Sequence, residues 1–441
     1  MRVTYLGHTA ALIETRGKRI LVDPWLTDPA YVNSWWHWPP VNLRPEELGR
    51  IDLLYVSHPH PDHFDPKTLA RLDSATPVVL GKFPRQPLKE KLESIGFRDI
   101  RLVPFWEPRE IFPGVKLLMT PSQHSVWDTN DTSMAVWTEE GTLYDGNDCV
   151  LHEAFAKRLK EAVPRIDLAM MPFTPNFHYP LCFDSLSDAE KKVELVRMKE
   201  KDLSRLLGHV KLLDPAAVMP FGSPFVLPAD EETAISAGRP TTLPSEAVKY
   251  LDDHGVKAKT FFMYPGDRYD FREGLRRHGS TDYFDDYDGK IRAYRAEKAD
   301  ELKRLRRHEL LAGADFPDVV KAYFQLKLKH ARKLGLKDRL ALVFPDRGGE
   351  TVLWNFGEGT VEFLKTCPDA YDMGIRIPSH LLGMVCRGVA HWDDILFSFR
   401  CRFIQRVYSA SLWGLLRNEE PELLRDWRAW ELEKTQGGAR A

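Results

Sequence analysis

Six consecutive residues constrain this chain more than any other part of its sequence. The run HPHPDH at residues 58–63 holds three imidazoles and a carboxylate, which are common donors to Zn²⁺ and Fe²⁺ in proteins. The apolar run 51–56 precedes it and predicts a buried strand. Side chains two apart in an extended segment point the same way. The first two histidines can therefore bind one ion, and the aspartate with the last histidine can bind a second.

Size and composition limit the class of protein. The 441 residues favour two domains, and 43% hydrophobic with 29% charged residues is usual for a globular protein. The formal net charge is −2, with no basic stripe, so we expect no nucleic-acid partner. The widely spaced cysteines favour a cytoplasmic location over a disulfide framework. No apolar run reaches about 18 residues, and we expect no membrane partner.

Strands alternate with helices over the first two thirds of the chain, which predicts an α/β fold of two mixed sheets covered by helices. The helices expected there are residues 67–72, 87–95, 153–162 and 186–207. We place a domain boundary near residue 290, so that 1–290 is the catalytic domain and 291–441 is a smaller α/β domain. The smaller domain is expected to contain helices 293–311 and 318–334 and a hairpin of 340–344 with 351–356.

The HxHxDH pattern resembles the metallo-β-lactamase superfamily, which implies an αββα sandwich and a centre for two metal ions. The resemblance places Asp23 in a turn beneath the site, His124 as the next ligand, and Asp148 between the ions. Asp145 competes for that bridging role, and we favour Asp148 because it lies beyond the strand end. The implied ligand set is His58, His60, Asp62, His63, His124 and Asp148.

One ligand of the superfamily is missing. A last histidine is expected after a late strand, but residues 219–223 read Met-Pro-Phe-Gly-Ser. Either a position is open or filled by water, or another residue substitutes. His178 is the best substitute, and with Asp62 it is our candidate catalytic residue; a solvated loop histidine is an equal alternative. His8 follows the first strand and is either structural or hydrogen-bonded near the site.

Further segments are similar to the metallo-β-lactamase-fold part of CMP-N-acetylneuraminate hydroxylase and its bacterial relatives. They are residues 147–149, 219–223, 264–267, 377–379 and 391–396. The resemblance implies a monooxygenase that uses two Fe ions, O₂ and an external electron donor to hydroxylate a small organic or natural-product substrate. That hydroxylase has a Rieske domain ahead of this fold. Because this chain begins with the fold and lacks the Cys/His pairs of a Rieske centre, we expect the electrons to come from a separate reductase, a small donor or the substrate.

Hydrolysis is the alternative. Two Zn ions in the same cluster would acidify a bridging water and deliver hydroxide to a phosphodiester, lactone or amide. Asp62 would then also orient the nucleophile. Mixed nitrogen and oxygen donors accept zinc as well as iron. A metal-dependent sensor without catalytic activity is the third hypothesis.

Two other segments carry expectations. Residues 35–38 read Trp-Trp-His-Trp; we expect a loop on the wall of a substrate pocket, because four large rings in a row are not easily buried. Core packing is the alternative.

The C-terminal domain resembles sterol-carrier folds and would bind an apolar ligand, pack over the site or form a homodimer. Asp393 and Asp394 are interpreted as charges at a helix N-terminus.

Overall fold

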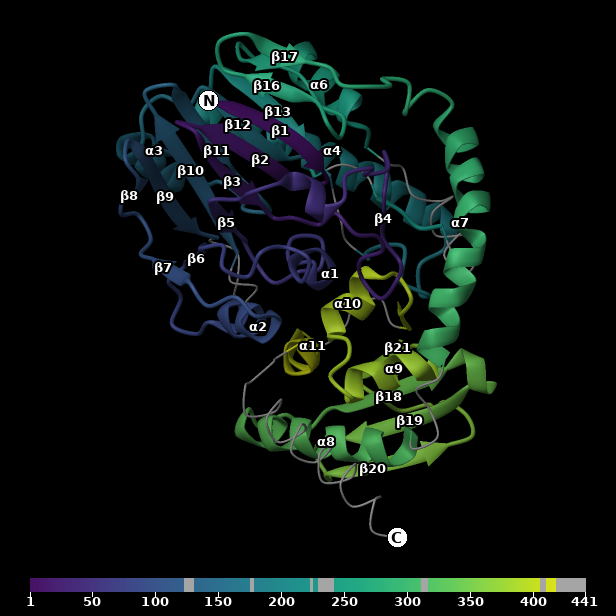
Figure 1. Ribbon diagram of the computed structural model, residues 1–441. Coiled ribbons are helices and arrows are strands. Elements are labelled where there is room, and N and C mark those ends of the chain that lie inside the picture. The colour runs from purple at the N-terminus through teal and green to yellow at the C-terminus, as the bar shows by residue number, and fades with distance from the viewer. Residues whose placement is uncertain are drawn as a thin grey trace.

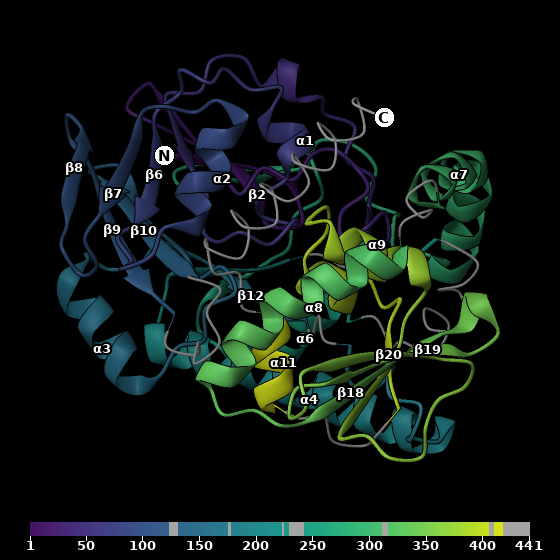
Figure 2. The ribbon, with the colours of Figure 1, turned by 90° about the horizontal axis from the view of Figure 1, so that it is seen from below.

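The computed structural model describes residues 1–122, 131–174, 178–222, 225–228, 242–310, 316–404 and 410–417. Two sheets pack face to face in the N-terminal part, and a third sheet with its own helices lies below them (Figure 1). Seen from below, the C-terminal helices lie across the strands of the third sheet (Figure 2).

The first sheet begins as an antiparallel meander and continues with parallel strands. Its spatial order is β17 (Gly274–Arg276), β16 (Arg268–Asp270), β1 (Arg2–Gly7), β2 (Ala10–Thr15), β3 (Lys18–Val22), β5 (Leu53–Tyr55), β6 (Val78–Gly81) and β7 (Ile100–Val103). A tight turn joins β2 to β3, where Arg16 and Gly17 both have positive φ, as this turn type requires. β5 lies in the parallel half, between β3 and β6.

The second sheet is also mixed. Its spatial order is β15 (Lys259–Thr260), β13 (Ala217–Phe221), β12 (Leu168–Pro172), β11 (Gly141–Asp145), β10 (Thr132–Thr138), β9 (Val115–Pro121) and β8 (Arg109–Phe112). The strands from β8 to β11 pair antiparallel, and those from β11 to β15 pair parallel.

Alternating apolar residues hold the sandwich together. Val3 and Ile20 of the first sheet share one buried cluster with Leu117 and Met219 of the second. The outer face of the first sheet packs against α1 (Pro66–Leu69) and α2 (Pro87–Ile95), and that of the second against α3 (Glu153–Ala162), α4 (Asp188–Leu213) and α6 (Pro244–Asp253). This arrangement confirms the predicted αββα sandwich.

Helix ends follow local signals in the sequence. α2 has the predicted bounds and ends at Gly96, whose φ of 121° suits glycine. α4 starts with a capping box of Ser187 and Glu190, and runs beyond the predicted end at 207 to a left-handed Asp214. Hydrophobic residues continue along its buried face to Leu213, which explains the extra turns.

The C-terminal region is a separate α/β unit, as predicted. The long helix α7 (Tyr287–Leu310) leads to α8 (Phe316–Lys333). A sheet follows in the order β20 (Thr360–Leu364), β19 (Glu350–Asn355), β18 (Arg339–Phe344), β21 (Met373–Arg376) and β22 (Arg402–Phe403), with α9 (Ser379–Cys386), α10 (Trp392–Phe397) and α11 (Ala410–Arg417). The domain limits stay a prediction, and residue 290 falls within α7. The likeness to sterol-carrier folds also stays a prediction.

The premise that residues 35–38 resist burial was wrong, and their place on the wall of a substrate pocket stays a prediction. Trp35, Trp36, His37 and Trp38 are all less than a tenth exposed. β4 (Trp36–His37) pairs with β14 (Phe225–Val226), and Trp35 stacks on Phe225 at 3.3 Å between ring centroids. The indoles of Trp36 and Trp38 pack against side chains of α7. Coverage by distant segments, which local sequence does not reveal, buries all four rings.

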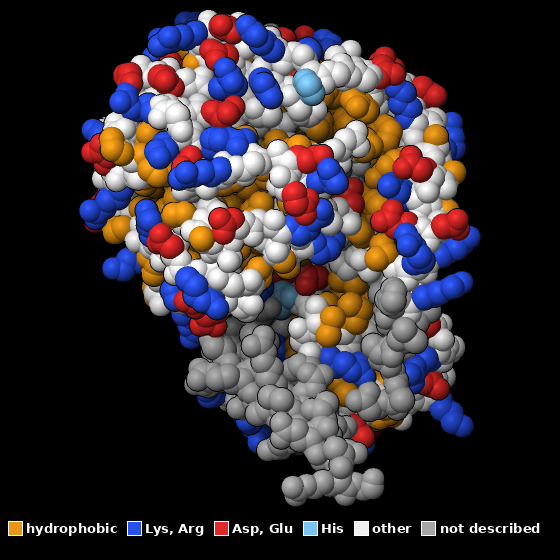
Figure 3. All heavy atoms as spheres, viewed as in Figure 1, with side chains coloured by type: hydrophobic (Ala, Val, Ile, Leu, Met, Phe, Trp, Pro, Cys, Tyr) orange, Lys and Arg blue, Asp and Glu red, His pale blue; other side chains and the backbone are white. Residues whose placement is uncertain are grey.

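Side chains at the surface are mixed in charge. On the face in Figure 3, basic and acidic groups are interspersed over the sandwich. Among the described helices, none is both long enough and apolar enough to cross a membrane.

The C-terminal core yields a stability prediction. Trp354 on β19 is fully buried, whereas Phe363 on the neighbouring β20 is 43% exposed. We expect Trp354→Ala to lower the free energy of unfolding by about 3–5 kcal/mol, because it leaves a cavity. The matched change Phe363→Ala is expected to cost no more than ~0.5 kcal/mol. Chemical denaturation followed by circular dichroism measures both, and equal losses would contradict this account of the core.

Candidate metal centre

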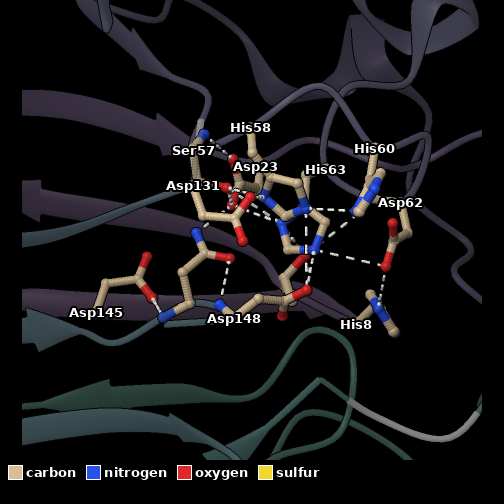
Figure 4. Close-up of polar contacts among 12 residues, drawn as sticks. His8, Asp23, Ser57, His58, His60, Asp62, His63, Asp131, Asp145 and Asp148 are labelled. Carbon is tan, nitrogen blue, oxygen red and sulfur yellow. Dashed lines mark hydrogen bonds and ion pairs between the residues drawn. The ribbon is translucent and has the colours of Figure 1, made fainter. Parts of the chain in front are cut away.

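The histidine loop begins where β5 ends, inside the sandwich. A tight turn closes it, because the backbone N–H groups of His63 and Phe64 both donate to the carbonyl of His60, at 2.9 and 2.7 Å. The prolines between the histidines restrict the remaining backbone freedom. His58 and His63 are fully buried, and Asp62 is 3% exposed. In Figure 4 the side chains of this loop gather beside those of His8 and Asp148.

One group of donors is formed by His58, His60 and Asp148, whose nearest ligand atoms lie within 4.8 Å of one another. Nε2 of His58 and Nδ1 of His60 are 2.9 Å apart. Asp148 Oδ2 is 3.9 Å from His58 Nε2. His124, the predicted further ligand, lies outside the described residues.

A second group of donors contains His8, Asp62 and His63. His8 Nε2 is 2.9 Å from Asp62 Oδ2, and His63 Nε2 is 3.5 Å from the same oxygen. His8 follows β1 with a left-handed φ of 49°, and its carbonyl accepts a hydrogen bond from the N–H of Gly222. Gly222 belongs to the segment where the superfamily's last histidine was expected. The backbone of His8 thus lies beside the segment where the missing ligand was expected.

Asp148 lies between the two groups. Its Oδ2 is 3.6 Å from His63 Nε2 and 3.9 Å from His58 Nε2. Packing around the partly exposed Asp148 carboxyl disfavours its charge, but the nearby His63 and His58 hold its pKa below the ordinary value. Asp145 differs, because burial and the charge of Asp23 raise its pKa well above the usual range. Asp145 belongs to neither donor group.

The donors fit metal ions. Nε2 of His60 and Nε2 of His63 are buried and make no hydrogen bond within the described structure. Buried polar atoms are almost always hydrogen-bonded, so such atoms beside carboxylates suggest another partner. Each group combines two imidazoles with one carboxylate and no thiolate. This donor chemistry suits a catalytic divalent ion with open positions, of zinc or iron.

Asp23 organises the loop from below. Its Oδ2 is 2.9 Å from His63 Nδ1 and accepts hydrogen bonds from Ser57 Oγ and Asn147 Nδ2 at 2.7 and 2.6 Å. Its Oδ1 accepts the backbone N–H of Ser57 at 2.7 Å. The contact with Asp23 directs the other ring nitrogen of His63 to the donor group. Burial disfavours charge on His63, but Asp62, Asp148 and Asp23 raise its pKa well above the ordinary value.

The imidazole pKa of His58 is shifted in the opposite direction from that of His63. Burial, reinforced by the nearby His63, lowers the pKa of His58 to about 4. Its imidazole is therefore neutral at physiological pH, the state in which it can bind a metal ion. Its Nδ1 is 3.0 Å from Ser57 Oγ and 3.8 Å from Asp131 Oδ1, which leaves Nε2 facing the donor group.

Tyr31 belongs to the site and was missed from the sequence. Its hydroxyl donates to Asp62 Oδ1 at 2.5 Å. Tyr31, Val32 and Asn33 have φ of 46°, 52° and 59°, so three successive residues are left-handed. This conformation is costly for non-glycine residues, above all for a β-branched valine. No local signal in the sequence marks such a turn.

Asp393 was interpreted only as a helix charge. The neighbouring Asp394 does have that role, since its Oδ2 accepts the N–H of His391 at 2.7 Å. The Asp393 side chain instead faces the centre, with Oδ2 3.9 Å from His60 Nε2. The only hint was its place within 391–396, one of the segments similar to the hydroxylase branch.

The structure does not bring His178 into either donor group. Its ring lies against Phe183 and Phe403, at centroid distances of 5.8 and 5.4 Å. Burial, together with the charge of Arg417, lowers the pKa of His178 to about 4. Its catalytic assignment stays a prediction.

Asp23 provides a test of the loop. Asp23→Asn removes the charge that orients His63 and should weaken metal binding about 10–100-fold. Competition with a chromophoric chelator measures this affinity. The control Asp73→Asn changes an exposed aspartate on the loop after α1 and should leave the affinity unchanged. Equal affinity of the two variants would exclude an orienting role of Asp23.

His178 predicts a pH effect on stability. A folded-state pKa of about 4 lies below the unfolded value of about 6.5, so the neutral ring stabilises the fold above pH 6.5. That contribution, ~3 kcal/mol, is lost as the pH falls from 6.5 to 4. His178→Phe should flatten the loss of unfolding free energy over this range, and His254→Phe at an exposed histidine should not. Parallel pH profiles for wild type and His178→Phe would contradict the prediction.

Comparison with known proteins finds a family match in the N-terminal part of the chain. Residues 2–192 match the family model described as a Beta-lactamase superfamily domain. A Mycolicibacterium smegmatis protein named "Putative Rieske 2Fe-2S iron-sulfur protein" is 30% identical over 299 residues, covering 63% of this chain and 51% of that protein. The cytidine monophosphate-N-acetylneuraminic acid hydroxylase of Danio rerio is 24% identical over 447 residues, covering 97% of this chain and 73% of that protein.

The chain spans about half the length of the Rieske-named protein it matches. Among solved structures, CmlA, a diiron β-hydroxylase from Streptomyces venezuelae, is 16% identical with a TM-score of 0.41, covering 63% of this chain and 54% of that one. That likeness is too distant to bear on activity. The family match over residues 2–192, together with the sandwich and its histidine loop, confirms the predicted resemblance to the metallo-β-lactamase superfamily and the metallo-β-lactamase fold.

Proposed function

We propose that this protein is a non-heme diiron monooxygenase that hydroxylates a small organic substrate. The observation that carries the proposal is the composition of the two donor groups, each with two imidazoles and one carboxylate. This combination with open positions is the donor set of non-heme Fe²⁺ oxygenases. His58, His60 and Asp148, with the predicted His124, would hold one ion; His8, Asp62 and His63 would hold the other.

The relatives support an oxygenase over other uses of this fold. The Danio rerio relative is named as a hydroxylase, and its similarity extends over 97% of this chain, including the C-terminal region. The mycobacterial relative is named for a Rieske 2Fe-2S centre, which transfers electrons. We therefore propose that a separate reductase or iron–sulfur protein supplies electrons to this chain.

The overall reaction balances as follows. One oxygen atom of O₂ enters a C–H bond of the substrate and the other leaves as water. The electron donor supplies two electrons, and two protons come from solvent. When bound, the iron ions would activate O₂, and the protein would position the substrate and control its access to the metal centre.

The chain's own residues define the surroundings of that chemistry. Phe397 lies 5.3 Å from the His60 ring and 5.5 Å from the Tyr31 ring, and these aromatic groups exclude water from one side. Burial and the charge of Asp62 raise the pKa of Tyr31 well above its ordinary value. The phenol therefore stays protonated and holds Asp62 by donating to it. The Asp148 side chain is 38% exposed, so we propose that the substrate approaches from that side.

The alternative is a dinuclear zinc hydrolase acting on a phosphodiester, lactone or amide. The same donor groups favour it, because catalytic zinc also takes three protein ligands and keeps an open position. In that case the ions would lower the pKa of a bound water. Asp62, held by Tyr31 and His8, would orient the nucleophile.

Metal content decides between the two. We expect protein purified without added metal and without air to contain about two iron atoms per chain, on the two donor groups. Elemental analysis gives the count, and Mössbauer and EPR spectroscopy should reveal a coupled pair that reacts with O₂ after reduction. Two zinc atoms without oxygen-reactive iron would overturn the oxygenase proposal in favour of the hydrolase.

A further inference from the structure

The two ring nitrogens of His60 face different partners. Nδ1 lies 2.9 Å from Nε2 of His58 and so points into the first donor group. Nε2 points the other way, toward Asp393 Oδ2 at 3.9 Å, and makes no hydrogen bond in the described structure. A histidine that binds a metal through one nitrogen usually donates the other N–H to a carboxylate or carbonyl. Asp393 is the carboxylate in that position.

The other two histidines of the loop already have a polar partner at Nδ1, a carboxylate for His63 and a hydroxyl for His58. His63 Nδ1 is 2.9 Å from Asp23, and His58 Nδ1 is 3.0 Å from Ser57 Oγ. At 3.9 Å the contact between His60 and Asp393 is longer than a hydrogen bond, by about 1 Å. Polar contacts in ligand-free sites are often long and tighten on binding.

Asp393 is held rigidly as an anion. Arg417 contacts both carboxylate oxygens, with Nε 2.5 Å from Oδ1 and Nη2 donating to Oδ2 at 2.9 Å. α11, which carries Arg417, is anchored by Lys327, whose Nζ donates to the carbonyls of Leu415 and Leu416.

The segment around Asp393 is fixed against the sandwich at the same place. Trp35 Nε1 donates to the carbonyl of Phe397 at 2.7 Å. Arg400 Nη1 donates to the carbonyl of Val32 at 3.2 Å, within the left-handed turn that presents Tyr31. These two polar contacts hold the C-terminal end of α10 and the residues after it against the segment that carries Tyr31.

We propose that Asp393 is a positioning residue of the metal centre: it accepts a hydrogen bond from Nε2–H of His60 and so fixes Nδ1 as the ligand atom. The C-terminal region thereby completes a site whose ligands lie in the N-terminal sandwich. The inference rests on the metal centre of the proposed function, but neither on the choice of iron nor on the reaction.

The first test reads the tautomer of His60 in the unmodified full chain. Zinc-loaded protein with ¹⁵N-labelled histidine is examined by ¹H–¹⁵N NMR, and His60→Gln assigns the signal. The expected result is a hydrogen-bonded proton on Nε2 and a metal-bound Nδ1. A proton on Nδ1, or an Nε2–H that exchanges freely with solvent, would overturn the inference.

The second test uses Co²⁺ as the probe. Asp393→Asn keeps the shape of the side chain but removes its charge, and should weaken one of two binding steps about 10–100-fold and change the visible spectrum. Asp394→Asn, the same change one residue along, should leave both steps and the spectrum unchanged. Thermal unfolding of the metal-free proteins checks that both fold. If Asp393→Asn does not fold, the NMR result on the wild type decides alone.

The two proposals fail in different ways. Wild type that binds no divalent ion would overturn the metal centre and the role of Asp393 together. Wild type that binds two ions while Asp393→Asn retains both affinities and the spectrum would overturn the role of Asp393 alone. Two bound zinc ions with an intact Asp393 effect would support the inference and leave only the oxygenase proposal wrong.

Discussion

A single buried carboxylate connects the parts of the sandwich that carry the site. Asp23 follows β3 of the first sheet, has no solvent exposure, and contacts Ser57 and His63 after β5 and Asn147 after β11. A buried charge is costly unless it is paired and hydrogen-bonded. Asp23 meets that requirement only when loops from both sheets converge on it. The contacts that satisfy Asp23 therefore fix both the alignment of the two sheets and the geometry of the metal donors.

The local part of the site could be predicted from the sequence, because its donors lie within a few residues of one strand end. The HPHPDH run and Asp148 come together with the strands that deliver them. The αββα layering followed from periodicity and from the family resemblance. Hydrophobic periodicity is a local signal, and the histidine pattern is a short motif. Neither depends on how distant segments of the chain pack.

The remaining parts depend on contacts between distant segments. Tyr31 reaches Asp62 through three left-handed residues, a conformation that propensities disfavour. His8 was one isolated histidine, and only the pairing of β1 and β2 turns it toward the loop. Trp36 and Trp38 are buried by α7, some 250 residues along the chain. Tertiary packing, rather than local pattern, determines each of these positions.

The span of the site along the chain has a consequence for biosynthesis. Its described groups run from His8 to Arg417, and Asp393 follows His60 by about 330 residues. At a translation rate of about 5–20 residues per second, the histidine loop leaves the ribosome tens of seconds before α10. During that interval the sandwich can fold while one side of its donors remains uncovered. A metal ion bound before release of the chain would therefore occupy a site that still lacks α10. That ion would be exposed to solvent and could exchange with other ions.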